Sequence, residues 1–159
     1  MKDLNLLAAD VGKLAKQAGY KIATVESCTG GWLGKALTEI VGSSEWYEAG
    51  FITYSNTSKV QLVQVDEAVI QQSGAVSEPV AIAMANGALN NTQADVAVAT
   101  TGIAGPDGGT SEKPVGTVWF AWIIRDKRSK TDHQVFSGNR TEVREQSVVR
   151  ALSGLISLF

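Results

Sequence analysis

Cysteine and histidine are nearly absent from this sequence, which contains one of each, Cys28 and His133. A single cysteine cannot form an internal disulfide, and so few thiols fit a reducing compartment such as the cytoplasm. Structural zinc sites need several cysteine or histidine ligands. The sequence therefore argues against a disulfide framework and against a zinc cluster.

An excess of positive charge and a long apolar run are missing as well. The chain has 14 lysines and arginines against 16 aspartates and glutamates, a net charge of −2 at pH 7. Without a basic footprint, neither nucleic acid nor an anionic membrane is an expected partner. No apolar run approaches the roughly 20 residues of a membrane-spanning helix, and residues 1–3 lead into a polar helical pattern, unlike a signal peptide.

What the sequence does contain is typical of one globular domain. Its 159 residues are 44% hydrophobic and 19% charged, which is ordinary for a soluble protein. A chain of this length buries roughly two-thirds of its unfolded surface. We therefore expect a single domain over residues 1–159.

Strand and helix patterns alternate along most of the chain, and the last expected strand returns as a hairpin partner at a sheet edge. This order predicts an α/β fold, a three-layer α/β/α sandwich with a mixed sheet. The expected strands are residues 21–25, 50–54, 94–100, 115–124 and 131–136, and the expected helices begin at or just after Asp3, Gly31, Ser55, Asp66, Ser77 and Asn139.

A polar stretch separates the first expected strand from the helix that runs to about Val41. A strand-to-helix turn places side chains at the carboxyl end of a sheet and leaves backbone N–H groups free. This suits a nucleophile beside an anion-binding pocket, but serine and threonine are also ordinary helix caps, so both readings remain open. The residues of this stretch are Glu26, Ser27, Cys28, Thr29, Gly30 and Gly31.

The segment 102–114 is a glycine-rich loop of a length that is usually functional or disordered. It lacks the G-K-[ST] ending of a Walker A loop, and residues 29–34 lack the first glycine of a dinucleotide-binding motif. Backbone N–H groups of the loop could cradle an anion, or the loop could be a solvated turn.

Two pairs of residues could complete a site. If the second strand neighbours the first, Tyr54 and Lys59 can reach the turn at residues 26–31. A desolvated lysine there could act as a base for Ser27. The alternative is an exposed lysine on a helix. Arg140 and Arg144 lie in the first turns of the last helix, where cations oppose the helix dipole, and a bound phosphate would explain them.

Together these segments resemble the CinA C-terminal domain family, the nicotinamide mononucleotide deamidases. The resemblance spans nearly the whole chain, in the stand-alone form, with small departures at Thr101 and Asn139. The matching segments are 26–31, 54–59, 74–79, 101–109, 113–118 and 136–140.

The resemblance implies hydrolysis of the carboxamide of nicotinamide mononucleotide to nicotinate mononucleotide and ammonia, without a metal or other cofactor. It also implies recycling of pyridine nucleotides in the bacterial cytoplasm by a homo-oligomer, a dimer or higher. The alternative from another class is a non-catalytic module that binds pyridine nucleotides in the same pocket.

The resemblance also gives the residues roles. It implies Ser27 as nucleophile, Lys59 as its base and Tyr54 as a relay or orienting group, with the oxyanion held near residues 29–31 or by the Thr101–Gly102 turn. Arg140 or Arg144 would bind the phosphate together with the loop 105–109. The predicted catalytic residues are thus Ser27, Lys59, Tyr54 and Thr101, and the predicted substrate-binding residues are Glu26, Thr29, Gly30, Gly31, Gly102, Gly105, Gly108, Gly109, Arg140 and Arg144.

Cys28 is a competing nucleophile, because a thiolate is intrinsically stronger than a serine hydroxyl. Adjacent residues in an extended turn point in roughly opposite directions, so only one of them is expected to face the substrate. Cys28 has no histidine nearby to activate it, whereas Ser27 has Lys59 and Tyr54 as partners. We therefore expect Ser27 to attack.

Overall fold

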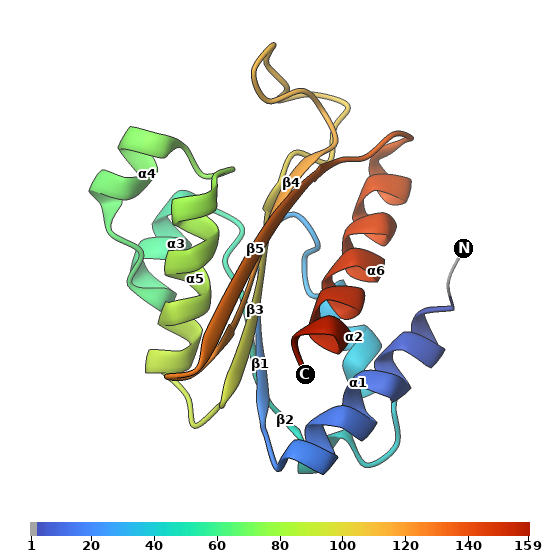
Figure 1. Cartoon of the computed structure of the whole chain (residues 1–159). Coiled ribbons are helices and arrows are strands. Elements are labelled where there is room, and N and C mark those ends of the chain that lie inside the picture. The colour runs from blue at the N-terminus through green and yellow to red at the C-terminus, as the bar shows by residue number, and fades with distance from the viewer. Residues whose placement is uncertain (1–2) are drawn as a thin grey trace.

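A five-stranded sheet lies at the centre of the protein, with helices on both faces, in a computed structural model that describes residues 3–159 (Figure 1). The expected domain and the expected polar start of the chain both include residues 1 and 2. These two residues lie outside the described residues. The strands are β1 (Ile22–Glu26), β2 (Tyr47–Ile52), β3 (Val96–Gly102), β4 (Thr117–Ile124) and β5 (Arg128–Val135). The helices are α1 (Leu4–Ala18), α2 (Trp32–Thr38), a short 3₁₀ helix η1 (Ser43–Glu45), α3 (Asn56–Val63), α4 (Glu67–Ser73), α5 (Glu78–Asn90) and α6 (Arg140–Leu158).

The strands follow the order β2-β1-β3-β4-β5. Strand β1 pairs in parallel with β2 and β3, whereas β4 is antiparallel to β3 and to β5. The mixed sheet between two helical layers confirms the predicted three-layer α/β/α sandwich. Because β1, β2 and β3 are parallel, their carboxyl ends meet at one edge of the sheet, where ligands bind in α/β folds.

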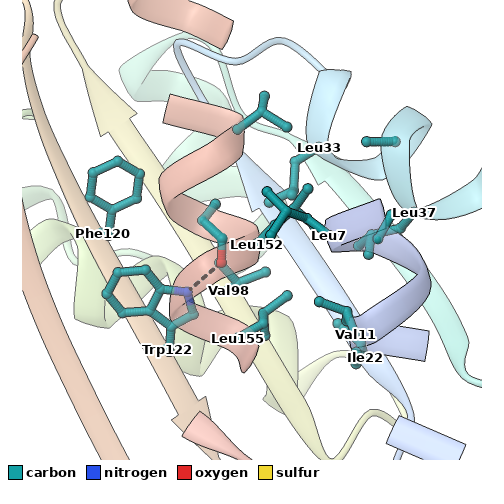
Figure 2. Packing of buried hydrophobic residues seen from close by; sticks show 14 of the residues in the cluster. Leu7, Val11, Ile22, Leu33, Leu37, Val98, Phe120, Trp122, Leu152 and Leu155 are labelled. Atoms are coloured by element: carbon teal, nitrogen blue, oxygen red, sulfur yellow. Dashed lines mark hydrogen bonds between the residues drawn. The ribbon is translucent and has the colours of Figure 1, made fainter. Parts of the chain in front are cut away.

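Each face of the sheet carries its own apolar core. Helices α1, α2 and α6 cover one face, and Figure 2 shows Leu7, Leu152 and Trp122 packed there. The indole Nε1 of Trp122 donates to the Ala151 carbonyl at 2.9 Å, so this buried ring leaves no polar atom without a partner. Helices α3, α4 and α5 cover the other face (Figure 1), and the buried cluster there includes Met84. Strands β1 and β3 are therefore enclosed on both sides, which suits their apolar sequences.

The predicted helix ends are confirmed at several positions. The Asp3 side chain accepts from the Asn5 N–H at the start of α1, and Gly19 ends that helix in a left-handed conformation. Asn139 and Glu142 form the predicted capping box at the start of α6. No helix within residues 3–159 combines the length and the apolar character needed to cross a membrane.

Three predicted boundaries are wrong by three residues. Strand β5 begins at Arg128 rather than at residue 131, because residues 128–130 pair with β4. Strand β2 begins at Tyr47, three residues before the expected start, because Tyr47 and Ala49 pair with β1 across a shift in register, and the Tyr47 hydroxyl also bonds Thr24 Oγ1 at 2.8 Å. Helix α2 ends at Thr38, short of the expected Val41. All three differences arise at exposed or half-exposed edges, where the residues lack the apolar pattern that marks a buried element.

Candidate active site

The chain leaves β1 in a tight turn at residues 27–31, called here the serine turn. The Ser27 N–H donates to the Thr100 carbonyl at 2.9 Å, which extends the pairing of β1 with β3 by one residue. Gly30 and Gly31 have φ angles of 59° and 96°, values that favour glycine. The serine turn thus places Ser27 at the carboxyl edge of the parallel strands.

Lys59 reaches Ser27 from the neighbouring strand connection. Its Nζ lies 3.1 Å from Ser27 Oγ, 2.8 Å from the Thr53 carbonyl oxygen and 3.4 Å from the Tyr54 carbonyl oxygen. The lysine is 1% exposed and forms no salt bridge within residues 3–159. Burial of the ammonium group lowers the pKa of Lys59 to about 8.

Three oxygens accept hydrogen bonds from Lys59 Nζ, as the three N–H groups of an ammonium allow, and the Ser27 hydroxyl donates to the Tyr54 carbonyl at 3.5 Å. A neutral lysine has two N–H groups and one lone pair. After loss of a proton, the carbonyl oxygens of Thr53 and Tyr54 can keep the two N–H groups, and the lone pair would then face the Ser27 hydroxyl. The arrangement can therefore deprotonate Ser27 when a substrate carbon approaches its oxygen.

Cys28 sits next to Ser27 in a different environment. Both residues line the same cavity, but the Cys28 side chain also packs into the apolar core below α6. Burial raises the pKa of the Cys28 thiol to about 12. Because the thiolate is the nucleophilic form, this site keeps Cys28 unreactive near neutral pH.

A cavity of about 300 Å³ opens over Ser27 and Lys59. Eight of the fourteen predicted site residues line it, and they come from the ends of β1, β2 and β3, from α3, from the loop after β3 and from α6. These eight are Ser27, Tyr54, Lys59, Thr101, Gly102, Gly105, Gly108 and Arg140.

The rim of this cavity is formed by Tyr54, Asp107 and Arg140. The Arg140 guanidinium donates to the Gly105 carbonyl at 2.7 Å and to the Tyr54 hydroxyl at 2.9 Å. Tyr54 therefore meets Lys59 through its backbone carbonyl, while its phenol lies with Arg140. On the wall, Thr101 Oγ1 donates to the Ala75 carbonyl at 2.8 Å, which ties β3 to the segment before α5.

The other six predicted residues lie outside the lining of this cavity. The Glu26 carboxylate accepts hydrogen bonds from the backbone of the serine turn and of α2, and Arg144 donates to the carbonyls of Cys28 and Thr29. The Gly109 Cβ position would fall 2.6 Å from the Val115 backbone nitrogen, so Gly109 serves close packing in the loop. The six residues are Glu26, Thr29, Gly30, Gly31, Gly109 and Arg144.

Sequence reasoning assigned no role to Asn56 and Asp107, which also line the cavity. Asn56 follows the carboxyl end of β2, and Asp107 lies in the glycine-rich loop after β3. Their positions after parallel strands are the signal that could have identified them.

Comparison with known proteins places the chain in a family. Residues 4–159 match the CinA C-terminal domain. The chain is 50% identical over 157 residues to the nicotinamide-nucleotide amidohydrolase PncC of Escherichia coli strain K12, covering 99% of this chain and 95% of that protein. It is 44% identical over 158 residues to the protein of the same name from Pseudomonas putida, covering 99% and 98%.

Solved structures agree in fold. The competence/damage inducible protein CihA of Agrobacterium tumefaciens superposes with a TM-score of 0.96 at 42% identity, covering 99% of this chain and 96% of that one. The competence damage-inducible protein A of Klebsiella pneumoniae superposes with a TM-score of 0.94 at 35% identity, covering 98% and 96%.

Proposed function

The chain belongs to the CinA C-terminal domain family, and on that premise we propose that it hydrolyses the carboxamide of nicotinamide mononucleotide to nicotinate mononucleotide and ammonia. Relatives named nicotinamide-nucleotide amidohydrolase, which match over nearly their whole length, support this substrate class. The observation that carries the proposal is the 3.1 Å contact between Ser27 Oγ and the buried Lys59 Nζ at the base of the cavity.

In the proposed first half-reaction, Ser27 Oγ attacks the amide carbon while neutral Lys59 takes the hydroxyl proton. The tetrahedral intermediate collapses, the C–N bond breaks, and the Lys59 ammonium returns the proton to the departing nitrogen, which leaves as ammonia. In the second half-reaction Lys59 takes a proton from water, the hydroxide opens the acyl ester, and Ser27 Oγ recovers its proton. The carbonyls of Thr53 and Tyr54 orient Lys59 throughout.

We assign the oxyanion to the backbone N–H groups of Cys28 and Thr29. Within residues 3–159 neither group has a hydrogen-bond acceptor on another residue, whereas the N–H groups of Gly30 and Gly31 are bonded to the Ser27 carbonyl and to Glu26. The residue after the nucleophile supplies an oxyanion donor in other hydrolases that place serine on a strand-to-helix turn.

Arg140 is the proposed phosphate ligand, because it is the one arginine or lysine besides Lys59 that lines the cavity within residues 3–159. Backbone N–H groups of the loop around Gly105 and Gly108 would complete the phosphate site. The neutral amide then reaches the buried end of the cavity, and the anionic end of the substrate stays at the rim.

Ammonia release from nicotinamide mononucleotide by the purified protein tests the proposal, with Ser27→Ala as the blank. The alternative, a non-catalytic pyridine-nucleotide-binding module, has one observation in its favour, because the cavity could bind a nucleotide without any reaction. Binding by calorimetry without ammonia release would favour that alternative.

The proposal extends to biological context. We expect the enzyme to recycle pyridine nucleotides in the bacterial cytoplasm and to assemble as a homo-oligomer, a dimer or higher. Light scattering coupled to gel filtration measures the assembly state directly.

A further inference from the structure

The serine turn is held on the side away from the cavity by two ionisable side chains. The first is Glu26, which is 1% exposed. Its carboxylate accepts from the backbone N–H groups of Gly31 at 3.2 Å, Leu33 at 2.9 Å and Gly34 at 3.0 Å. It also accepts from Thr29 Oγ1 at 2.7 Å. One buried carboxylate thus collects the N–H groups of the turn and of the start of α2.

The second side chain, Arg144, approaches from the second turn of α6. Its guanidinium donates to the Cys28 carbonyl at 3.1 Å and to the Thr29 carbonyl at 3.2 Å, and it lies 5.6 Å from the centre of the Trp32 ring. A Cβ at Gly30 would fall 3.3 Å from the guanidinium. The arginine is therefore fitted against the turn, with Nε and one Nη donating to backbone carbonyls.

We propose that Glu26 and Arg144 are positioning residues for amide hydrolysis, an inference that rests on the proposed function. Glu26 fixes the N–H groups of the serine turn, and Arg144 fixes the carbonyl groups. Together they hold Ser27 Oγ beside Lys59 and keep the peptide N–H groups of Cys28 and Thr29 oriented for the oxyanion. Neither side chain lines the cavity, so both act through the backbone.

The geometry separates this role from phosphate binding, the role that the sequence suggested for Arg144. A phosphate ligand would line the cavity. Arg140 does so, whereas Arg144 lies outside that lining and directs Nε and one Nη at backbone carbonyls of the serine turn. The two arginines lie one helical turn apart and face different partners.

The test uses Arg144→Met in the full chain. We expect kcat to fall by about a hundredfold, because small misplacements of a nucleophile cost this much. The KM for the nucleotide should stay within about twofold, and the loss of kcat should be equal for the dephosphorylated riboside. Hydrogen exchange of the Gly31, Leu33 and Gly34 amides should accelerate, since loss of the arginine frees the turn.

Two further variants sharpen the result. Arg144→Lys should restore part of the lost kcat and leave it about tenfold below the wild-type value. The lysine ammonium keeps the positive charge but cannot reproduce the planar, two-point donation of the guanidinium. Arg150→Met is the matched control: Arg150 lies on the same helix, pairs with Asp132 at 2.7 Å and packs over the Trp122 ring. This control should leave both kcat and the hydrogen-exchange rates of the Gly31, Leu33 and Gly34 amides unchanged.

Glu26→Gln tests the proposed positioning role of Glu26. It removes the negative charge and turns an amide N–H toward a backbone N–H, so we expect faster exchange in the turn and a lower kcat at unchanged KM. If this variant does not fold, the Arg144 series decides the proposal.

A higher KM for the nucleotide but not for the riboside, at unchanged kcat, would make Arg144 a phosphate ligand and overturn the proposal. Unchanged kcat with unchanged exchange in Arg144→Met would overturn it as well. If the wild-type protein releases no ammonia, the proposed function fails, while hydrogen exchange still decides whether Arg144 holds the turn.

Discussion

The floor of the cavity, Ser27 and Lys59, differs from its rim, Tyr54, Asp107 and Arg140, in exposure and in charge. Ser27 and Lys59 are 7% and 1% exposed, whereas Tyr54 is 60% exposed and Arg140 is also exposed. Lys59 faces neutral oxygens and has a lowered pKa, while the Arg140 guanidinium lies near solvent. In the proposed mechanism, burial at the floor favours the neutral amine that acts as base, and exposure at the rim leaves a cation within reach of an anion.

The largest effect should come from the floor. Ser27→Ala removes the proposed nucleophile, so we expect the rate of ammonia release to fall by roughly three decades or more. The fold should persist, since the residue is small. Rapid inactivation by iodoacetamide that substrate prevents, combined with an inactive Cys28→Ala, would transfer the nucleophile to Cys28.

Lys59 should come next. Lys59→Met removes the base, and Lys59→Arg keeps the positive charge but cannot lose a proton near pH 7, so both should lower kcat by about two to three decades. Circular dichroism checks that both variants fold. A Lys59→Arg enzyme with a near-native rate would show that the floor needs only a cation.

The same lysine predicts a pH dependence. Because the neutral amine is the active form, kcat/KM should rise about tenfold per pH unit below about 8 and level off above it. The pKa is lower in the folded protein than the ordinary 10.5, so the unfolded chain binds more protons between about 8 and 10.5. The free energy of unfolding should therefore rise with pH across that window, and Lys59→Met should lose this slope.

The rim should show a smaller effect that depends on the substrate. Arg140→Ala should raise the KM for the nucleotide by about tenfold to a hundredfold, the usual value of a charge-assisted hydrogen bond, and leave the riboside unaffected. Wild-type enzyme should also use the riboside much less well. Equal specificity constants for nucleotide and riboside would remove the phosphate site from the rim.

Cys28→Ala should have the smallest effect. The thiol is buried and carries a raised pKa, so the variant should keep most of its activity. The smaller side chain should cost about 1 kcal/mol of stability. Denaturant unfolding measures this loss, and a stability unchanged from wild type would show that Cys28 contributes no packing.

The sequence predicted the fold well because helix caps and apolar periodicity are local signals. Asp3 and Asn139 cap the starts of their helices as expected. The start of β2 was missed because Tyr47 is fixed by a contact with Thr24, a residue 23 positions away. Such a contact depends on the tertiary arrangement and leaves no periodic pattern.

The site was predictable where it depends on strand order. Once β1 and β2 are neighbours, Ser27 and Lys59 can meet, and the structure brings them together. The placement of Arg144 was beyond the sequence, because its partners are backbone carbonyls about 115 residues away. Backbone groups are the same at every residue, so no side-chain motif reveals them.

Glu26 has a consequence for turnover. In the proposed reaction the substrate amide is neutral, but the nicotinate product carries a new carboxylate beside the serine turn. Unoccupied N–H groups at Gly31, Leu33 and Gly34 would attract that anion and slow its departure. Because Glu26 already occupies them on the side of the turn away from the cavity, these three N–H groups offer no additional anion site, and product release is favoured over product inhibition.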